Sequence, residues 1–367
     1  MYLTRFFISL SLSLSLSLDG RGPSHRAKGE VRFVDRGEGS RPKQQVLRPA
    51  EAAMRSFLLL LWGLWGLVGA SDFRICAFNV QVFGESKSKN VEVMKTLVKI
   101  IARCDVCVLQ EVRDSKNKAV PKLMAELNSY YRDSRYDSVS SESLGRSAYQ
   151  EQYVFVYRTA TAEVVGQYQY PDNLPGSPDA FAREPFVVRF SAPSTAIKSF
   201  VLIPVHTSPE NATIEIDALY DVFTAVRRKW SNENVMLLGD FNADCSYLPK
   251  KNRKNVRLLT DRRFLWLIGD DRDTTVREST DCAYDRIVVE GNTFPGLIVP
   301  GSAEPFLFPA EYGLTEEQAL SVSDHYPVQV SLRSGPDQKQ RPLKSGPPPG
   351  QVLSPPLMLA VCWLAFS

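Results

Sequence analysis

Short apolar runs rich in β-branched and aromatic residues recur along the chain, and this recurrence constrains the fold more than any other feature. Runs of this length, bounded by turn residues, are typical of buried strands. Between them, apolar residues recur at helical spacing from Val91 to Ala102 and from Ile214 to Trp230. Strands separated both by helices and by hairpin-like turns predict an α/β fold, a four-layer sandwich of two packed mixed sheets with outer helices. The expected strands are FRICAFNV, DVCVLQEV, YVFVY, FVVRF, SFVLIPVHT, NVMLLGDFN, DRIVV and HYPVQVSL.

The size of the chain suits this architecture. Its 367 residues exceed one small domain but fit one large α/β domain with extra segments at both ends. We place the domain at residues 71–332. The hydrophobic content of 44% is enough for a sizeable core. The net charge of +3 is too mild to identify a partner, and it does not mark a strongly cationic nucleic-acid binder.

The segment from Met54 to Ala70 has the composition of a secretory signal. It carries one positive charge at Arg55, then an apolar run, then small residues before Ser71. We expect a signal peptide at residues 54–70, and the alternative, a transmembrane anchor, is disfavoured because the run is short for a bilayer. Residues 1–53 combine an alternating Ser/Leu stretch with a polar Gly/Arg/Lys-rich segment. We interpret them as an upstream extension that is absent from the working protein.

The C-terminal end has the parts of a glycolipid-anchor signal. Residues 333–356 form a polar Pro/Gly-rich linker, and residues 357–367 form an apolar tail that is too short for a transmembrane helix. Small residues at Ser345 and Gly346, followed by a spacer and the tail, predict attachment at Ser345, although Pro347 departs from the pattern. The alternative is a disordered tail. We therefore expect a protein of the secretory pathway, extracellular or on the outer face of the plasma membrane, with the endoplasmic reticulum as the other compartment.

An oxidising compartment would allow disulfides among the six cysteines. We expect the pair Cys245–Cys282, because both residues lie in polar loop contexts. Cys104 and Cys107 form a CxxC, but a metal or redox site would need a partner pair that the sequence lacks. We expect these two to be buried free thiols. The Asn-x-Thr sequon at Asn211 predicts a glycan on a surface loop.

Several expected strands end in acidic, amide or imidazole side chains. Polar groups at strand ends tend to converge on one rim of a sheet. Each one alone has an ordinary explanation as a turn residue, but their recurrence on successive strands favours a functional site. These side chains are Asn79, Glu111, His206, Asp240, Asn242, Asp324 and His325.

This set of side chains fits phosphodiester hydrolysis. That reaction needs a metal for the non-bridging oxygens, a base to activate water and an acid for the leaving oxygen. Mg²⁺ prefers oxygen ligands, and the absence of a Cys/His cluster disfavours zinc. A lone histidine is more often structural than catalytic. However, His206 and His325 are the only histidines after the signal segment, and both lie beside carboxylate-bearing motifs.

The same residues, taken with their neighbours, carry a family resemblance. The segments FNVQVFG, LQEVRDS, LGRSAYQEQYVF, AREP, VMLLGDFNADCSY, DCAYDRIVV and SDHYPVQV resemble the deoxyribonuclease I family, in order, from Asp72 to Leu332. Apurinic endonucleases, inositol polyphosphate phosphatases and neutral sphingomyelinases are broader relatives that share elements like QE, GDFN and SDH. DCAYDRIVV and YQEQY favour the deoxyribonuclease I branch. The signal segment and tail further resemble its membrane-anchored DNase I-like 1 subgroup.

The resemblance implies a secreted or cell-surface endonuclease. It would hydrolyse double-stranded DNA with low sequence specificity and leave 5′-phosphate ends. The catalytic ion would be Mg²⁺ or Mn²⁺, bound by Glu111 with Asn79 beside it, and Asp324 would complete the shell. Asp240 and Asn242 would hold a second ion or the scissile phosphate.

The resemblance also assigns partners to the two histidines. His206 would pair with Glu151, and His325 would pair with Asp285. Each carboxylate would orient its imidazole and favour the protonated form. One imidazole would act as the base and the other as the acid, and the sequence does not decide which is which.

DNA contacts follow from the same resemblance. Arg113, Arg183 and Tyr149 match positions that reach phosphates and the minor groove, both of which suit arginine. Tyr149 and Tyr247 would pack on sugars, with ordinary edge packing as the alternative for either ring. Such an enzyme would read the shape of the groove more than the identity of the bases.

Two structural Ca²⁺ sites are also implied, and their role would be to clamp loops. The second match is looser because the chain has an extra residue between its acidic ligand and Cys282. The first site comprises Asp179, the carbonyl of Phe181 and Glu184, and the second includes Asp273 and Thr275.

The chain departs from the family pattern at two places. The loop at residues 171–181 lacks the small second disulfide of the family, and residues 138–141, where the family has an apolar actin-binding patch, are mostly polar. We expect weak or absent actin binding and a monomer. The alternative functions are a phosphomonoesterase or sphingomyelinase of the same superfamily, and a catalytically dead cell-surface binding protein. The DNA-contacting residues argue against the first alternative, and the complete catalytic set argues against the second.

Overall fold

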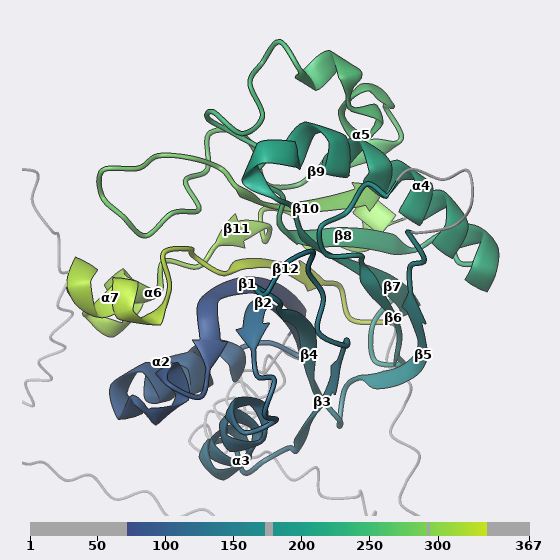
Figure 1. Ribbon diagram of the computed structural model, residues 1–367. Coiled ribbons are helices and arrows are strands. Elements are labelled where there is room, and N and C mark those ends of the chain that lie inside the picture. The colour runs from purple at the N-terminus through teal and green to yellow at the C-terminus, as the bar shows by residue number, and fades with distance from the viewer. Residues whose placement is uncertain (1–71, 173–178, 292–293, 336–367) are drawn as a thin grey trace, which may run out of the picture. The chain divides into compact units, whose positions relative to one another are not determined.

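The computed structural model describes residues 72–172, 179–291 and 294–335 (Figure 1). All of them belong to the compact unit Gly69–Ser367. The predicted upstream extension, signal peptide and hydrophobic tail lie outside the described residues, as does almost all of the polar linker.

The first of two six-stranded mixed sheets has the order β11-β12-β1-β2-β4-β3. β1 and β2 run parallel, with Ile75 opposite Val106, and the other neighbours are antiparallel. The strands are β1 (Phe73–Gly84), β2 (Val106–Arg113), β3 (Tyr136–Ser140), β4 (Gln152–Arg158), β11 (Glu304–Pro305) and β12 (Val328–Leu332).

The second sheet has the order β5-β6-β7-β8-β10-β9. Here β7 and β8 are the parallel pair, with His206 opposite Asp240. The strands are β5 (Glu163–Gln169), β6 (Phe186–Ala192), β7 (Lys198–His206), β8 (Val235–Asp240), β9 (Phe264–Trp266) and β10 (Asp285–Glu290).

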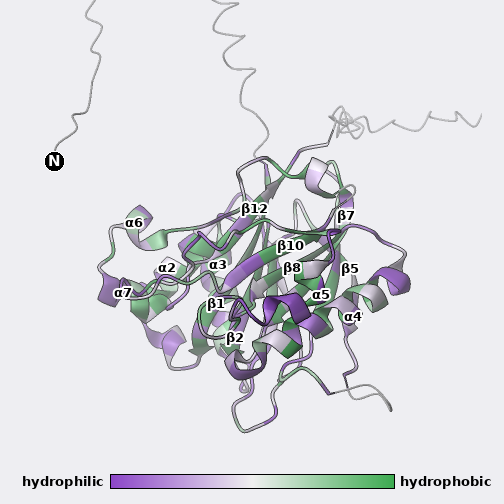
Figure 2. Cartoon of the chain, turned by 90° about the horizontal axis from the view of Figure 1, so that it is seen from above, coloured by the Kyte–Doolittle hydropathy of each residue, from purple (hydrophilic) through white to green (hydrophobic). Residues whose placement is uncertain are grey.

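The two sheets pack face to face around one apolar layer. Ile75 and Ala77 of β1 point into this layer, whereas Cys76 and Phe78 point to the opposite face, which is the two-residue period of a strand. Figure 2 shows the apolar strands in the middle, with α2 and α3 on one side and α4 and α5 on the other. Helices therefore cover both outer faces, and the expected four-layer α/β sandwich is confirmed.

Helices α2 (Val91–Ile101) and α4 (Ala212–Trp230) match the two helical patterns of the sequence. The Asn90 side chain caps α2 by accepting from Glu92 N and Val93 N. Further helices were not expected, because they are short or carry weak periodicity. They are α3 (Ala119–Tyr130), α5 (Arg257–Thr260), α6 (Phe308–Tyr312), α7 (Glu316–Val322), and the 3₁₀ turns η1 (Lys87–Lys89), η2 (Pro209–Asn211), η3 (Arg253–Asn255) and η4 (Phe294–Leu297).

The disulfides confirm one sequence prediction and correct another. Cys245 and Cys282 are bonded, as expected. The expectation of a free thiol at Cys104 is wrong, because this residue is bonded to Cys76. The turn after α2 brings the two Cα atoms to 6.1 Å on the helix-covered face of the sheet. Cys107 is the buried free thiol that was expected.

We predict that replacing both Cys76 and Cys104 by serine lowers the free energy of unfolding by about 3 kcal/mol, because the bond closes a loop in the unfolded chain. The two residues are 28 positions apart. Urea unfolding under non-reducing conditions measures the change. Cys107→Ala is the matched control, since it removes a buried sulfur and no cross-link. Equal effects of the two changes would contradict the prediction.

Candidate active site

The chemistry-bearing side chains gather where strands of both sheets end. His206 closes β7 and Asp240 closes β8, and these parallel strands place the two residues side by side. Asp285 opens β10, which is antiparallel to β8, so that it lies opposite Asp240 on the same edge. Asn79 belongs to the matching region of β1. Carboxyl ends of parallel strands form such a site because polar side chains there are no longer packed between layers.

His206 is held by a buried carboxylate. Its Nδ1 bonds Glu151 Oε1, and only 8% of His206 and 3% of Glu151 are exposed. Its Nε2 lies 3.8 Å from Glu111 Oε1 and 3.7 Å from Asp240 Oδ2. The imidazole therefore has one nitrogen fixed within the protein and the other directed to the acidic centre.

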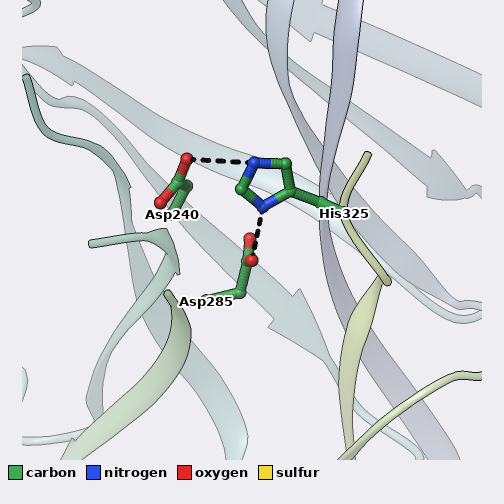
Figure 3. Close-up of side chains that lie close together, drawn as sticks. All are labelled: Asp240, Asp285 and His325. Carbon is green, nitrogen blue, oxygen red and sulfur yellow. Dashed lines mark hydrogen bonds and ion pairs between the residues drawn. The ribbon is translucent and has the colours of Figure 1, made fainter. Parts of the chain in front are cut away.

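His325 repeats this arrangement from the other side (Figure 3). Its Nδ1 bonds Asp285 Oδ2 at 2.7 Å, and its Nε2 lies 3.7 Å from Asp240 Oδ2. Asp324 Oδ1 is 3.9 Å from the same nitrogen. Both imidazoles thus present Nε2 to one oxygen of Asp240, and the predicted partners Glu151 and Asp285 are in place.

The charges of the site raise the pKa of both imidazoles. Burial alone would lower the pKa of His206, but the charge and hydrogen bond of Glu151 outweigh it. The pKa of His325 lies well above its usual value, because Asp285 and Asp240 outweigh burial in the same way. Burial acts to raise the pKa of Asp240, but the two imidazoles hold it below the usual value. The site therefore favours protonated imidazole beside ionised carboxylate.

A second acidic group lies beside the histidines. Asn79 Nδ2 donates to Glu111 Oε1 at 3.0 Å and to Asp240 Oδ2 at 3.1 Å, although Asn79 and Asp240 are 161 residues apart. Asp324 contributes a buried oxygen, Oδ1, that has no hydrogen-bond partner in the part of the chain that the structure describes. Carboxylate and amide oxygens are the ligands that hard divalent cations prefer, so these residues fit such an ion. Ligand atoms of Asp240, Asp285 and His325 also lie within 4.8 Å of one another.

The backbone at this site is strained. Gln81, Val82, Glu111 and Asn242 all have positive φ, between 43° and 57°. This conformation is rare for residues other than glycine, above all for a β-branched residue such as Val82. Val82 N donates to Glu111 Oε2 at 3.0 Å, so the strained turn holds the carboxylate. Strain of this kind persists where function requires a fixed geometry.

Gly239 explains why the Asp240 motif begins with glycine. Its φ is +131°, and an added Cβ would lie 2.3 Å from the carbonyl oxygen of Val205. Only glycine lets β7 and β8 approach this closely where they present His206 and Asp240. Beyond it, Asn242 is buried, and its Nδ2 donates to the carbonyl of Thr207 at 3.0 Å. Asn242 therefore joins the two strand ends.

The predicted DNA-contacting residues separate into two groups. The Arg113 guanidinium lies 4.1 Å from the ring centre of Tyr149, whose hydroxyl donates to Glu111 Oε2 at 3.2 Å. Arg113, together with Val82 and Lys87, also lines a hollow of 320 Å³. Tyr247, 37% exposed, packs on Tyr284, which in turn packs on His325.

Arg183 is placed differently from the other three. Its side chain is only 11% exposed and lies 3.3 Å from Glu151 Oε1. Its Nε donates to the carbonyl oxygen of His206 at 3.0 Å. The structure thus brings Arg183 to the histidine pair and leaves little of it at the surface.

The ligands predicted for the first calcium site make hydrogen bonds or ion pairs with other residues of the protein. Asp179 Oδ1 bonds Arg146 at 2.7 Å, and Phe181 N donates to the buried Asp172. The carbonyl of Glu184 accepts from the side chain of Gln169. Asp172 is an acidic neighbour that sequence reasoning missed. Both calcium sites stay predictions.

In the segment of the second predicted calcium site, the Asp273 carboxylate holds the loop together by hydrogen bonds. Its Oδ1 accepts from Thr275 N, from Thr275 Oγ1 and from Cys282 N. The loop that carries the Cys245–Cys282 bond is therefore tied by a carboxylate. The predicted glycan site Asn211 is exposed at the end of η2, as a surface sequon requires.

Two supporting residues had no signal in the sequence. Lys87 Nζ donates to the carbonyl oxygens of Val80 and Gln81, at 2.9 and 2.6 Å, and so holds the strained turn. Burial lowers the pKa of Lys87 to about 8. Ser323 Oγ donates to the carbonyl of Asn79 and accepts from His325 N. Both roles depend on residues that are distant in the chain.

Comparison with known proteins agrees with this geometry. The profile of the Endonuclease/Exonuclease/phosphatase family matches residues 76–325. Deoxyribonuclease gamma of Rattus norvegicus is 51% identical over 78% of this chain and 92% of its own length. Deoxyribonuclease-1-like 1 of Homo sapiens is 48% identical over 75% and 89%, and deoxyribonuclease-1 of Sus scrofa is 48% identical over 77% and 98%.

A solved structure shares the fold at low sequence identity. The endonuclease/exonuclease/phosphatase family protein from Leptotrichia buccalis is 16% identical, with a TM-score of 0.51 over 71% of this chain and 99% of that one.

Among the helices of residues 72–335 that are described, none combines the length and apolarity that crossing a membrane would require.

Proposed function

The chain belongs to the endonuclease/exonuclease/phosphatase family, in its deoxyribonuclease I group, and we propose that it is a metal-dependent endonuclease that acts on double-stranded DNA. One observation carries the proposal above all others. Two imidazoles, each held at Nδ1 by a buried carboxylate, direct Nε2 to the same oxygen of Asp240 at 3.7 Å. This is the arrangement of an acid and a base on either side of one reacting phosphate.

The two histidines move the protons of the reaction. Because Glu151 and Asp285 hold the Nδ1 protons, each Nε2 is free to take up or release one. The imidazole that starts neutral at Nε2 takes a proton from the attacking water as the water oxygen bonds phosphorus. The other, which starts protonated, gives its Nε2 proton to the 3′ oxygen as the phosphorus–oxygen bond breaks. The products are a 5′-phosphate and a 3′-hydroxyl.

The oxygen ligands of the site suit Mg²⁺ or Mn²⁺. Glu111, Asn79 and Asp324 would hold the catalytic ion, and Asp240 with Asn242 would hold a second ion or the scissile phosphate. When bound, such a cation neutralises charge on the non-bridging phosphate oxygens. The buried Asp324 Oδ1 supports this choice of ligands, since it accepts no hydrogen bond from the described residues, and a buried carboxylate oxygen without one is costly.

The rim of the site supports DNA as the substrate. Arg113 and Tyr149 form a stacked pair beside Glu111, and Tyr247 lies on the His325 side. Arginine and tyrosine can contact phosphates, sugars and the minor groove without reading a base sequence. Cleavage should therefore have low sequence specificity.

We predict that chelation of divalent metal abolishes plasmid nicking and that Glu111→Gln removes most of it at millimolar Mg²⁺. The substitution removes one carboxylate charge from the ion site and keeps the side-chain shape. Initial rates against Mg²⁺ concentration measure the effect, and the ends are identified by direct ligation, which needs a 5′-phosphate. Glu126→Gln, on the exposed face of α3, is the matched control.

Two outcomes would contradict the proposal. Full nicking by the chelated protein would exclude the metal requirement. Hydrolysis of sphingomyelin or of a phosphomonoester, with no nicking of DNA, would favour the other branches of the superfamily.

The cellular location of the enzyme is a further part of the proposal. The segment at residues 54–70 would direct secretion, and a lipid anchor at Ser345 would retain the protein on the cell surface as a monomer. Nuclease released from intact cells by phosphatidylinositol-specific phospholipase C would support the anchor, and its absence would argue for a freely secreted form. Strand β3 carries the polar residues Ser138 and Ser140 where an apolar actin-binding patch would be needed, so actin should bind weakly or not at all. Strong inhibition of the enzyme by excess monomeric actin would contradict this expectation.

A further inference from the structure

Arg183 contacts the His206–Glu151 pair from within the protein. Its Nε donates to the carbonyl oxygen of His206 at 3.0 Å and lies 3.3 Å from Glu151 Oε1. Its Nη2 is buried and has no hydrogen-bond partner among the described residues. An arginine that binds phosphate presents its guanidinium fork to the ligand. Here Nε is engaged with the protein, and only 11% of the side chain is exposed, so little of the fork is left for a ligand at the surface.

Tyr153 holds the same histidine on its other side. His206 N donates to Tyr153 Oη at 3.1 Å, and Tyr153 Oη donates to the carbonyl of Arg183 at 3.4 Å. Tyr153 is 2% exposed, so neither bond competes with water. Three atoms of His206 are therefore fixed: the amide by Tyr153, the carbonyl by Arg183 and Nδ1 by Glu151.

The charge of Arg183 also balances a buried group of acids. Glu151, Glu215 and Asp240 are each at most 3% exposed, and all three interact electrostatically with Arg183. A buried carboxylate that loses its cation is left uncompensated and tends to rotate toward other donors. Rotation of Glu151 would loosen its hold on Nδ1 of His206.

In the described part of the chain, the second histidine and its carboxylate are held without an arginine. His325 N donates to Ser323 Oγ at 3.0 Å, and Asp285 N donates to Thr274 Oγ1 at 3.1 Å. Within the described part of the chain, the only ion pair of Asp285 is with His325. The guanidinium thus serves one of the two imidazoles.

We propose that Arg183 is a positioning residue: it acts on catalysis by fixing Glu151 and the backbone of His206, and it does not bind the DNA. This inference rests on the proposed nuclease function. It assigns to Arg183 a role different from that of Arg113, which lies at the rim of the site.

Kinetics separate the two roles. Arg183→Gln is expected to lower kcat by about 10–100-fold, the usual cost of removing a supporting hydrogen-bond partner. KM and its dependence on salt should stay unchanged. Arg113→Gln should instead raise KM. It should also reduce the slope of log KM against log salt concentration by about one, as expected for one lost phosphate contact. Arg183→Lys keeps the charge and should recover part of kcat.

Tyr153→Phe tests the same support of His206 without changing any charge. It should lower kcat in the same direction as Arg183→Gln, again with KM unchanged. A lowered kcat in both variants supports positioning. A raised KM with a reduced salt slope in Arg183→Gln would overturn it, because that is the signature of a DNA contact.

A variant in the His206→Ala background makes the test independent of absolute rates. If Arg183 acts through His206, adding Arg183→Gln to His206→Ala costs no further activity. If Arg183 binds DNA, the second change still weakens the residual reaction. Arg113→Gln in the same background is the control, and it should retain its full effect.

The imidazole itself can be observed by NMR of ¹⁵N-histidine-labelled protein. The His206 Nδ1 proton signal, identified by its loss in His206→Ala, should move in Arg183→Gln and in Tyr153→Phe but not in Arg113→Gln. An unmoved signal in Arg183→Gln would overturn the inference. This readout needs no DNA, so a wild-type protein that fails to nick DNA would contradict the proposed function and leave the positioning role to be decided by the spectrum.

Discussion

His206→Ala should lower the rate of plasmid nicking by about 10²–10⁴-fold, the usual contribution of a positioned acid or base. The His206 imidazole bonds Glu151 through Nδ1 and lies 3.7 Å from Asp240 Oδ2 through Nε2, so its removal takes away the group between these two carboxylates. The fold should survive, because Glu151 keeps Arg183 as an ion-pair partner at 3.3 Å. The rate and the melting temperature of the same preparation measure the two effects separately.

His325→Ala should reduce nicking to a similar extent but should also destabilise the protein. It leaves Asp285, which is fully buried, without any cation among the described residues. A buried charge that loses its partner is strongly destabilising. The melting temperature of His325→Ala should therefore fall further than that of His206→Ala.

The two changes together should cost less than the product of their separate effects, because residues that act as a unit are not additive. Lys95→Gln is a suitable control, since Lys95 is exposed on α2 and, among the described residues, forms an ion pair with Glu92 alone. Nicking by His206→Ala at the wild-type rate would refute the proposed site.

Arg286→Met is expected to lower the free energy of unfolding by about 2–5 kcal/mol, because each buried carbonyl that loses its donor costs about 1–3 kcal/mol. The Arg286 side chain is 2% exposed, and its three nitrogens donate to separate segments. Nε bonds the carbonyl of Ala283 at 2.7 Å, Nη1 bonds that of Ile268 at 2.8 Å, and Nη2 bonds Asp270 Oδ1 at 2.7 Å. Methionine fills a similar volume but leaves the buried carbonyls without donors.

Urea unfolding measures this change, and Arg263→Met is the matched control. Arg263 is 43% exposed and pairs with Asp261 at the surface, where an ion pair contributes about 0–1 kcal/mol. Comparable losses in the two variants would show that Arg286 has no special role. Arg286 directly follows Asp285, the residue that bonds His325. The Arg286→Met protein should therefore also fix Asp285 less firmly.

Much of the fold could be read from local patterns. The two-residue alternation of β1 and the helical spacing of α2 and α4 are properties of neighbouring residues, and the structure has these elements where they were expected. α3 and the strands β3, β5, β9 and β11 were not foreseen. α3 has weak periodicity, β3, β9 and β11 are short, and β5 has no buried residue, so that packing against neighbouring elements determines them.

The candidate site was partly predictable for a different reason. Polar side chains at the ends of apolar strands stand out in the sequence, and the family resemblance supplied the pairs His206–Glu151 and His325–Asp285, which the structure brings within hydrogen-bond distance. The supports behind them had no such signal. Lys87 and Tyr153 look like an ordinary loop residue and an ordinary strand residue until the chain is folded.

The sequence by itself determined the layered α/β class, the polar strand ends and the scarcity of histidine, because each depends on residue type and spacing along the chain. Tertiary structure decided the contacts that neither the pattern nor the resemblance supplied. Asn79 bonds Asp240 across 161 residues, Cys104 bonds Cys76 instead of staying free, and Arg183 lies against His206 instead of at the surface. The physical reason is that such contacts depend on strand order and register between two sheets, and a change of one residue in register would turn strand side chains such as Asn79, Cys76 and His206 to the other face.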